Sequence, residues 1–159
     1  MRNKQKGFSL IELLIVVAII LIIAAIAIPN LLRSKMAANE ASAVGSLRTI
    51  NTACVTFSIN YGGFPGSLTA LGGEGTSSAP TSTAAELIDN VLQTGAKTGY
   101  SFGYVAGATD AAGNVDGYAV NAVPSSPGVT GLRYFFTDQT GVIRASSTAA
   151  ATSASTPIS

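Results

Sequence analysis

The chain has 159 residues, of which 47% are apolar and only 11% are charged, and its formal charge is +1. This length suffices for one modest domain with an appendage. The absence of histidine excludes Ser-His-Asp and Cys-His catalysis, the single cysteine excludes an intramolecular disulfide, and no basic patch that would predict general nucleic-acid binding remains beyond the N-terminus.

The first predicted element is an apolar helix from Phe8 to Ile28, in which Glu12 is the only charged residue. At 1.5 Å per residue this helix would measure about 32 Å, which matches the hydrocarbon core of a bilayer. The basic residues that precede it are Arg2, Lys4 and Lys6. The positive-inside rule keeps that end in the cytoplasm, so the residues after Pro29 are expected to be extracytoplasmic. An acid inside such a span is costly, and Glu12 is therefore expected to have a partner and a function.

Three interpretations of this segment compete. A secretory signal could be cut after Ala25-Ile26-Ala27, but its apolar region would be shorter and would not contain an acid. A plain membrane anchor would explain the length and the orientation, but neither Glu12 nor the Gly7-Phe8 boundary. In the third interpretation, Gly7-Phe8-Ser9-Leu10-Ile11-Glu12 resembles the prepilin signature of type IV pilins and of type II secretion pseudopilins. Pro29 also falls where many pilins have a proline that kinks the helix.

This resemblance implies that a prepilin peptidase cuts between Gly7 and Phe8 and that the new amine of Phe8 is N-methylated. Residues 1–7 would then be a leader, and residues 8–29 a transmembrane and polymerisation helix. Glu12 lies one helical turn from Phe8, so in a filament of staggered subunits it could pair with the Phe8 amine of a neighbouring copy. The implied partners are further copies of the chain, the peptidase, the inner-membrane pilus assembly machinery and the membrane before assembly.

Residues 30–61 are predicted to form an amphipathic helix that ends at Gly62-Gly63. Pro29 should kink the helix ahead of it, because proline has no amide hydrogen for the carbonyl of Ala25. Cys54 lies on the apolar face, so we expect a small buried residue and not a reactive thiol. The apolar positions repeat at three- and four-residue intervals. They are Leu32, Met36, Val44, Leu47, Ile50, Cys54, Phe57 and Tyr61.

Residues 62–95 are predicted to be a long loop with two short helices, and by the resemblance this region would be variable and exposed. The first helix is a single turn at Ser67 to Leu71. The second runs from about Ala84 to Thr94, because Thr83-Ala84-Ala85-Glu86 matches a capping box and Gly95 is a stop signal.

Residues 98–145 change to a period of two, which predicts a β-meander. Three strands are expected at Tyr100–Val105, Tyr118–Val123 and Leu132–Thr137, and a turn at 138–141 leads to a fourth at Val142–Arg144. Residues 30–144 would then be an extracytoplasmic head. Its meander would bury one face on the long helix, so the predicted class is α+β, with a kinked N-terminal helix packed on an antiparallel sheet of about four strands.

Two further segments bear on function. Asp110, Asn114 and Asp116 could supply oxygen ligands to Ca²⁺, but their spacing departs from the EF-hand pattern and the same residue types build polar turns. No metal or other cofactor is therefore expected, and these three residues remain weak metal candidates. Residues 146–159 are mostly Ser, Thr and Ala, which predicts a disordered tail.

The sequence thus predicts a structural protein and no enzyme: a pilin that is anchored in the inner membrane before assembly and found in an extracellular filament afterwards. One alternative is a type II secretion pseudopilin that forms a short periplasmic filament. A more distant alternative is a membrane-anchored extracytoplasmic binding domain. The scarcity of charged residues and the lack of clustered acids oppose a membrane-anchored enzyme.

Overall fold

The computed structural model describes residues 8–73 and 79–158. The predicted leader, residues 1–7 with the cleavage residue Gly7, lies outside this range. The chain divides into two compact units, Met1–Lys35 and Met36–Ser159, and helix α1 (Leu10–Tyr61) contributes residues to both. From here on, the second unit is called the head. Among the described helices, α1 is the one that is long and apolar enough to cross a membrane.

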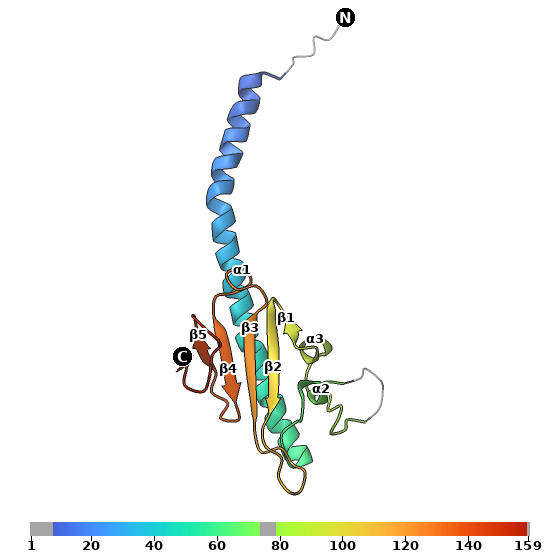
Figure 1. The fold of residues 1–159 in the computed structure, drawn as a ribbon. Coiled ribbons are helices and arrows are strands. Elements are labelled where there is room, and N and C mark those ends of the chain that lie inside the picture. Colours follow the sequence, from blue (N-terminus) through green and yellow to red (C-terminus); the bar gives the residue numbers. More distant parts are fainter. Residues whose placement is uncertain (1–7, 74–78, 159) are drawn as a thin grey trace, which may run out of the picture. The chain divides into compact units, whose positions relative to one another are not determined.

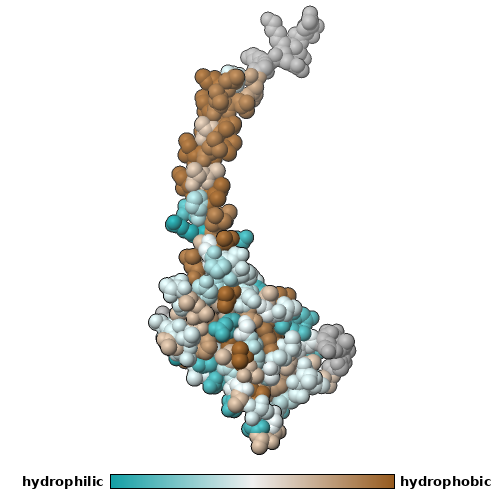
Figure 2. All heavy atoms as spheres, in the orientation of Figure 1, coloured by the Kyte–Doolittle hydropathy of each residue, from teal (hydrophilic) through white to brown (hydrophobic). Residues whose placement is uncertain are grey.

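The part of α1 in the first unit exposes its apolar side chains. Leu10 is 75% exposed, Ile20 58% and Ile26 65%. Figure 2 shows that most of the visible face of this segment is apolar. Such a surface needs an apolar environment supplied by lipid or by other helices. Helix α1 continues through Pro29 without a break, and a kink at that residue stays a prediction.

The part of α1 in the second unit buries one face against the sheet. Its buried apolar residues follow the predicted helical spacing, and they are Ala43, Leu47, Ile50, Ala53, Cys54 and Phe57. Leu32 is exposed, whereas Met36, Val44 and Tyr61 are half-buried, so only the middle of the predicted stripe forms the core. The helix ends at Tyr61, where Gly62 has a positive φ of 84°, as predicted from the glycine pair.

In the part of the chain that the structure describes, the sheet has six antiparallel strands in chain order. Figure 1 shows the second part of α1 lying against one face of strands β2 to β4. The strands are β1 Ala96–Lys97, β2 Tyr100–Ala106, β3 Tyr118–Pro124, β4 Tyr134–Asp138, β5 Arg144–Ser146 and β6 Thr156–Pro157. The predicted α+β class is confirmed. The expected number of about four strands is too low, because β1 and β6 have two residues each and so show no alternating pattern.

The predicted helix from Ala84 to Thr94 is wrong except for its last turn. Helix α3 spans only Asn90–Gln93, and the Asp89 carboxylate accepts a hydrogen bond from the Leu92 amide at 2.8 Å as its N-cap. The backbone ahead of α3 instead pairs with the predicted helical turn α2 (Leu68–Leu71). The Ala85 amide bonds the Ala70 carbonyl at 2.9 Å, and the Leu87 amide bonds the Leu71 carbonyl at 2.8 Å. These bonds replace the i to i−4 bonds that a helix would need.

The prediction of a disordered tail is wrong for residues 146–158. Strand β6 pairs with β5, and the Ile158 amide donates to the carbonyl of Ile143 at 2.9 Å. Ala151 is only 2% exposed, and Ile158 packs against the core. Backbone pairing and a few small buried groups therefore order a segment whose composition alone predicts disorder.

A chain that ends at Ala150 should have a less stable head. The truncation removes β6, the buried Ala151 and the packing of Ile158, which together should cost about 2 to 3 kcal/mol. Thermal unfolding of the full and truncated chains in detergent micelles, followed by circular dichroism, measures the difference. Thr148→Ala, at an exposed position of the same segment, should leave the melting temperature unchanged. Equal melting temperatures for the full and truncated chains would contradict the ordered tail.

Candidate assembly and processing site

The N-terminal end of α1 brings Glu12 against the backbone of Ser9. The Glu12 Oε2 atom accepts a hydrogen bond from the Ser9 amide at 2.9 Å, and the Leu13 amide donates to the Ser9 carbonyl at 3.3 Å. Ser9 is the residue before the first helical residue, so Ser9 and Glu12 have the spacing of a capping box. The carboxylate also lies near the positive end of the helix dipole. Glu12 thus has a partner within its own chain, which the sequence interpretation missed.

Phe8 lies two residues ahead of the first helical residue, and its side chain is 81% exposed. The spacing predicts that Phe8 lies one helical turn from Glu12, but Phe8 instead precedes α1. The pairing of Glu12 with the Phe8 amine of another copy needs a second chain and stays a prediction. Phe8 nevertheless lies beside the capped turn, so a cut before it would leave α1 and its cap intact.

A second polar cluster lies in the head, where the buried Glu40 joins α1 to the segment ahead of β4. Glu40 is 7% exposed, and its carboxylate accepts hydrogen bonds from the amides of Leu132 at 2.8 Å and Arg133 at 3.1 Å. The Arg133 Nε atom lies 2.7 Å from the other carboxylate oxygen. Next to it, the side-chain amide of Asn39 donates to the Thr130 carbonyl at 2.8 Å. The cluster fixes residues 130–133 on the helix.

The pKa of Glu40 reflects this arrangement. Burial alone would raise it, but the hydrogen bonds from Leu132 and Arg133 and the charge of Arg133 outweigh burial and lower the pKa below its ordinary value. The carboxylate is therefore ionised at neutral pH and serves as a fixed acceptor. Its role is structural, because all of its close partners belong to the head.

The candidate metal residues lie in a loop in which the Asp110 carboxylate accepts hydrogen bonds from its neighbours. The Asp110 Oδ1 atom accepts hydrogen bonds from the amides of Ala112 at 2.9 Å and Asn114 at 2.8 Å. The Asn114 side chain also donates to Asp110 Oδ2 at 3.3 Å. The amide of Asn114 is the main cause of the lowered pKa of the exposed Asp110. Within residues 8–73 and 79–158, no group of three or more His, Cys, Asp or Glu side chains could hold a metal ion. Asp110 thus has the turn-forming role that the sequence also allowed.

Cys54 is buried in the core, as predicted. Burial raises the pKa of its thiol to about 12, while nearby Tyr104 and Tyr118 act in the opposite direction. Because the thiolate is the reactive form, a thiol with such a pKa is inert at neutral pH. Cys54 therefore contributes packing and no chemistry.

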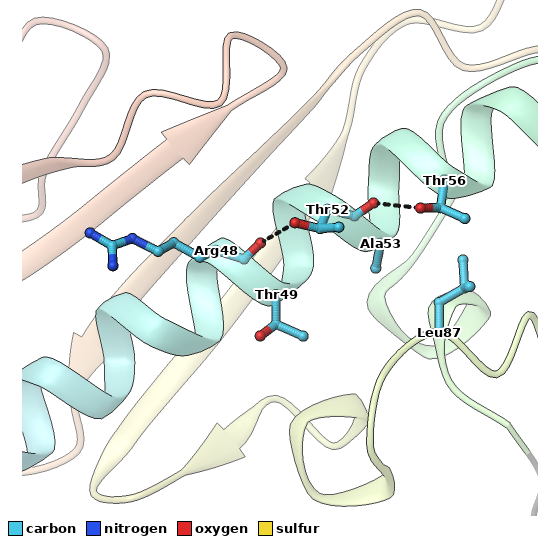
Figure 3. Close-up of a pocket in the computed structure, with 6 residues that line it drawn as sticks. All are labelled: Arg48, Thr49, Thr52, Ala53, Thr56 and Leu87. Carbon is cyan, nitrogen blue, oxygen red and sulfur yellow. Dashed lines mark hydrogen bonds between the residues drawn. The ribbon is translucent and has the colours of Figure 1, made fainter.

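The surface hollow shown in Figure 3 has a volume of about 340 Å³. It is lined by Arg48, Thr49, Thr52, Ala53, Thr56 and Leu87. Its threonines bond the helix backbone: the Thr52 hydroxyl donates to the Arg48 carbonyl at 3.0 Å, and the Thr56 hydroxyl donates to the Thr52 carbonyl at 2.9 Å. Arg48 is the one ionisable residue of this lining, so the hollow lacks the paired acid and base that catalysis needs.

Comparison with known proteins agrees with the N-terminal motif. Residues 2–28 match the family model described as the prokaryotic N-terminal methylation motif. The N-terminal segment of the chain is therefore similar to that of proteins with this methylation motif. Among the pilin-family relatives, the type IV wide pilus major component PilA4 of Thermus thermophilus is 65% identical over 40 residues, which are 25% of this chain and 30% of that protein.

Two other relatives match over more residues but with lower identity. The type IV major fimbrial protein FimA of Dichelobacter nodosus is 50% identical over 58 residues, covering 35% of this chain and 37% of FimA. The type II secretion system core protein G of Escherichia coli is 32% identical over 63 residues, covering 40% of this chain and 43% of that protein. The chain thus spans less than half the length of these curated relatives. No solved structure matches the chain significantly.

Proposed function

We propose that the chain is a structural subunit that polymerises into a type IV pilus-like surface filament. In this proposal a prepilin peptidase cuts between Gly7 and Phe8, and the new amine of Phe8 is N-methylated. The observation that carries the proposal is the match of residues 2–28 to the methylation motif. The relatives named as pilus and fimbrial components support it.

The structure supports this function through the apolar part of α1. Its exposed side chains would face lipid in the membrane and sister helices in a filament. Both environments are apolar, so transfer from the membrane pool to the filament would change the free energy little. The protein would be anchored in the inner membrane before assembly, with its N-terminus in the cytoplasm, and would need the pilus assembly machinery to extract it.

The N-terminus of the mature protein tests the proposal. Mass spectrometry of filaments sheared from the cell surface should find a subunit that begins at Phe8 and carries one methyl group. A Gly7→Leu chain is the control, because a branched side chain at this position should block the close approach of a protease, so that the leader is retained. A monomeric protein that keeps Met1 and never enters filaments would overturn the proposal.

The match to the type II secretion core protein G favours a second candidate function, a pseudopilin in a short periplasmic filament. Both candidates use the same N-terminal processing and the same apolar helix. The location of the polymer separates them: filaments that shear from the cell surface support the pilin, whereas a cleaved subunit that stays in the periplasm supports the pseudopilin.

A further inference from the structure

Two exposed basic residues, Arg33 and Lys35, follow the apolar segment on the side away from the leader. They are the first basic residues after Lys6. Both ion pairs between described residues lie in the head, and neither uses Arg33 or Lys35. Both cations are therefore available to an anion from outside the described part of the chain.

The spacing places both residues at one surface of a bilayer. If Leu10, the first helical residue, lies at the cytoplasmic edge of the hydrocarbon, the opposite edge is about 30 Å farther along, and the headgroup layer extends several ångströms beyond it. At 1.5 Å per residue, Arg33 lies about 35 Å and Lys35 about 38 Å from Leu10. The exposed Leu31 and Leu32 directly precede Arg33, so apolar contact extends up to the first of the two cations.

The direction of helical side chains brings these charges back toward the lipid. In an α-helix the Cα–Cβ bonds tilt toward the N-terminus, and long side chains follow that direction. In a bilayer-spanning α1 the N-terminal direction would lead into the membrane, so the guanidinium of Arg33 and the ammonium of Lys35 could reach toward the phosphate layer. Their aliphatic stems can remain in contact with apolar surface while the charged ends reach the phosphates.

Carboxylates of a second copy are the poorer partner for these cations. Most carboxylates of the head already accept bonds from groups of the head itself. These are Glu40, Asp89, Asp110 and Asp138. An anionic membrane surface instead offers a dense layer of phosphates at the depth of Arg33 and Lys35, and each basic residue near such a surface gains appreciable binding free energy.

We propose that Arg33 and Lys35 bind the phosphate groups of anionic phospholipids at the extracytoplasmic face of the membrane and thereby fix the depth of α1 before assembly. The inference rests on the proposed function only in requiring that α1 spans a bilayer. It adds a lipid partner for the membrane-bound pool of the protein, and it assigns a role to two residues outside the methylation motif.

The test is the lipid preference of the full chain in phosphatidylcholine vesicles. Electron paramagnetic resonance of spin-labelled phosphatidylglycerol and of spin-labelled phosphatidylcholine measures the fraction of each lipid that is immobilised beside the protein. The leader charges are the same in all variants, so differences report on residues 33 and 35. The preference for phosphatidylglycerol over phosphatidylcholine should be at least about twofold lower in the R33Q/K35Q chain than in the unaltered chain. The preference of the unaltered chain should also fall as the salt concentration rises.

Two control variants sharpen this test. R33K/K35R retains both charges and should retain the preference. R48Q removes an exposed charge from the head and should leave it unchanged. Equal preferences of the unaltered chain and R33Q/K35Q would overturn the inference. If that R33Q/K35Q chain also failed to form filaments, the result would show that the two cations pair with protein and not with lipid. A chain that does not insert into vesicles would instead overturn the spanning helix, and with it the proposed function.

Discussion

A Glu12→Ala chain is expected to insert into the membrane normally and to yield no surface filaments. Insertion depends on the apolar length of α1, which the substitution increases. Under the proposed function, we expect assembly to depend on the pairing of the Glu12 carboxylate with the Phe8 amine of a neighbour. Without that carboxylate the amine would be a charge buried without a partner, which costs about 3 to 5 kcal/mol. Each contact in the filament would then be weaker by two orders of magnitude or more.

The capping bond from the Ser9 amide makes a second variant more informative. Glu12→Gln can still accept that bond, because glutamine also serves in a capping box, but it cannot neutralise an amine. If the ion pair drives assembly, the glutamine and alanine variants should both fail. Quantitative shearing of filaments, with membrane-bound subunit measured in the same cells, provides the readout. Normal filaments from Glu12→Gln would show that Glu12 only caps its own helix.

The elements that could be predicted from the sequence are those in which apolar side chains repeat at a constant interval, over several turns of a helix or several residues of a strand. The α1 positions Leu47, Ile50, Cys54 and Phe57 are buried as expected, and strands β2 and β3 begin at Tyr100 and Tyr118 as predicted. In these segments one continuous apolar face packs on the core, and the repeat of that face is visible without knowledge of its partner.

The segments that could not be predicted are held by partners distant in the sequence. Residues 85–88 donate their amides to carbonyls of α2 and Gly72, so the Thr83–Glu86 signal forms no helix. Strand β4 begins two residues later than expected, after Leu132 and Arg133 have bonded Glu40. The tail is ordered by strand β5. These long-range contacts cannot be predicted from the local composition of each segment.

The candidate assembly site was predictable as a motif but not as a geometry. The order of Gly7, Phe8 and Glu12 indicated processing and methylation, and the match of residues 2–28 agrees with it. The capping bond of Glu12 could have been predicted, because Ser9-Leu10-Ile11-Glu12 has the S-x-x-E spacing. The pairing with Phe8 of another copy could not be settled in one chain, since its second partner belongs to a neighbour.

A Glu40→Ala substitution is expected to destabilise the head by about 3 kcal/mol. It leaves two backbone amides and the Arg133 guanidinium without their acceptor at a position that is almost fully buried. For a chain of this size that loss corresponds to a fall in melting temperature of about 6 to 12 °C. Circular dichroism of the full chain in detergent micelles, at neutral pH, measures it.

The same carboxylate should make stability depend on acidity. The pKa of Glu40 is lowered in the folded head, so its contribution is present above the unfolded pKa, about 4.3, and is lost as pH falls through the folded pKa. The stability difference between the unaltered chain and Glu40→Gln should therefore be constant near neutrality and should shrink below about pH 4. If this stability difference stayed constant at acidic pH, the charge of Glu40 would contribute nothing to the stability of the head.

Two matched variants separate the backbone contacts of Glu40 from its ion pair. Lys97→Ala removes the more exposed pair with Asp89, which should cost less than about 1 kcal/mol. Arg133→Ala leaves the Glu40 carboxylate bonded to the amides of Leu132 and Arg133, because the backbone donors remain. Its cost should lie between those of Lys97→Ala and Glu40→Ala. If Arg133→Ala proved the most damaging of the three, the ion pair would outweigh the backbone bonds, and the role assigned to Glu40 would be wrong.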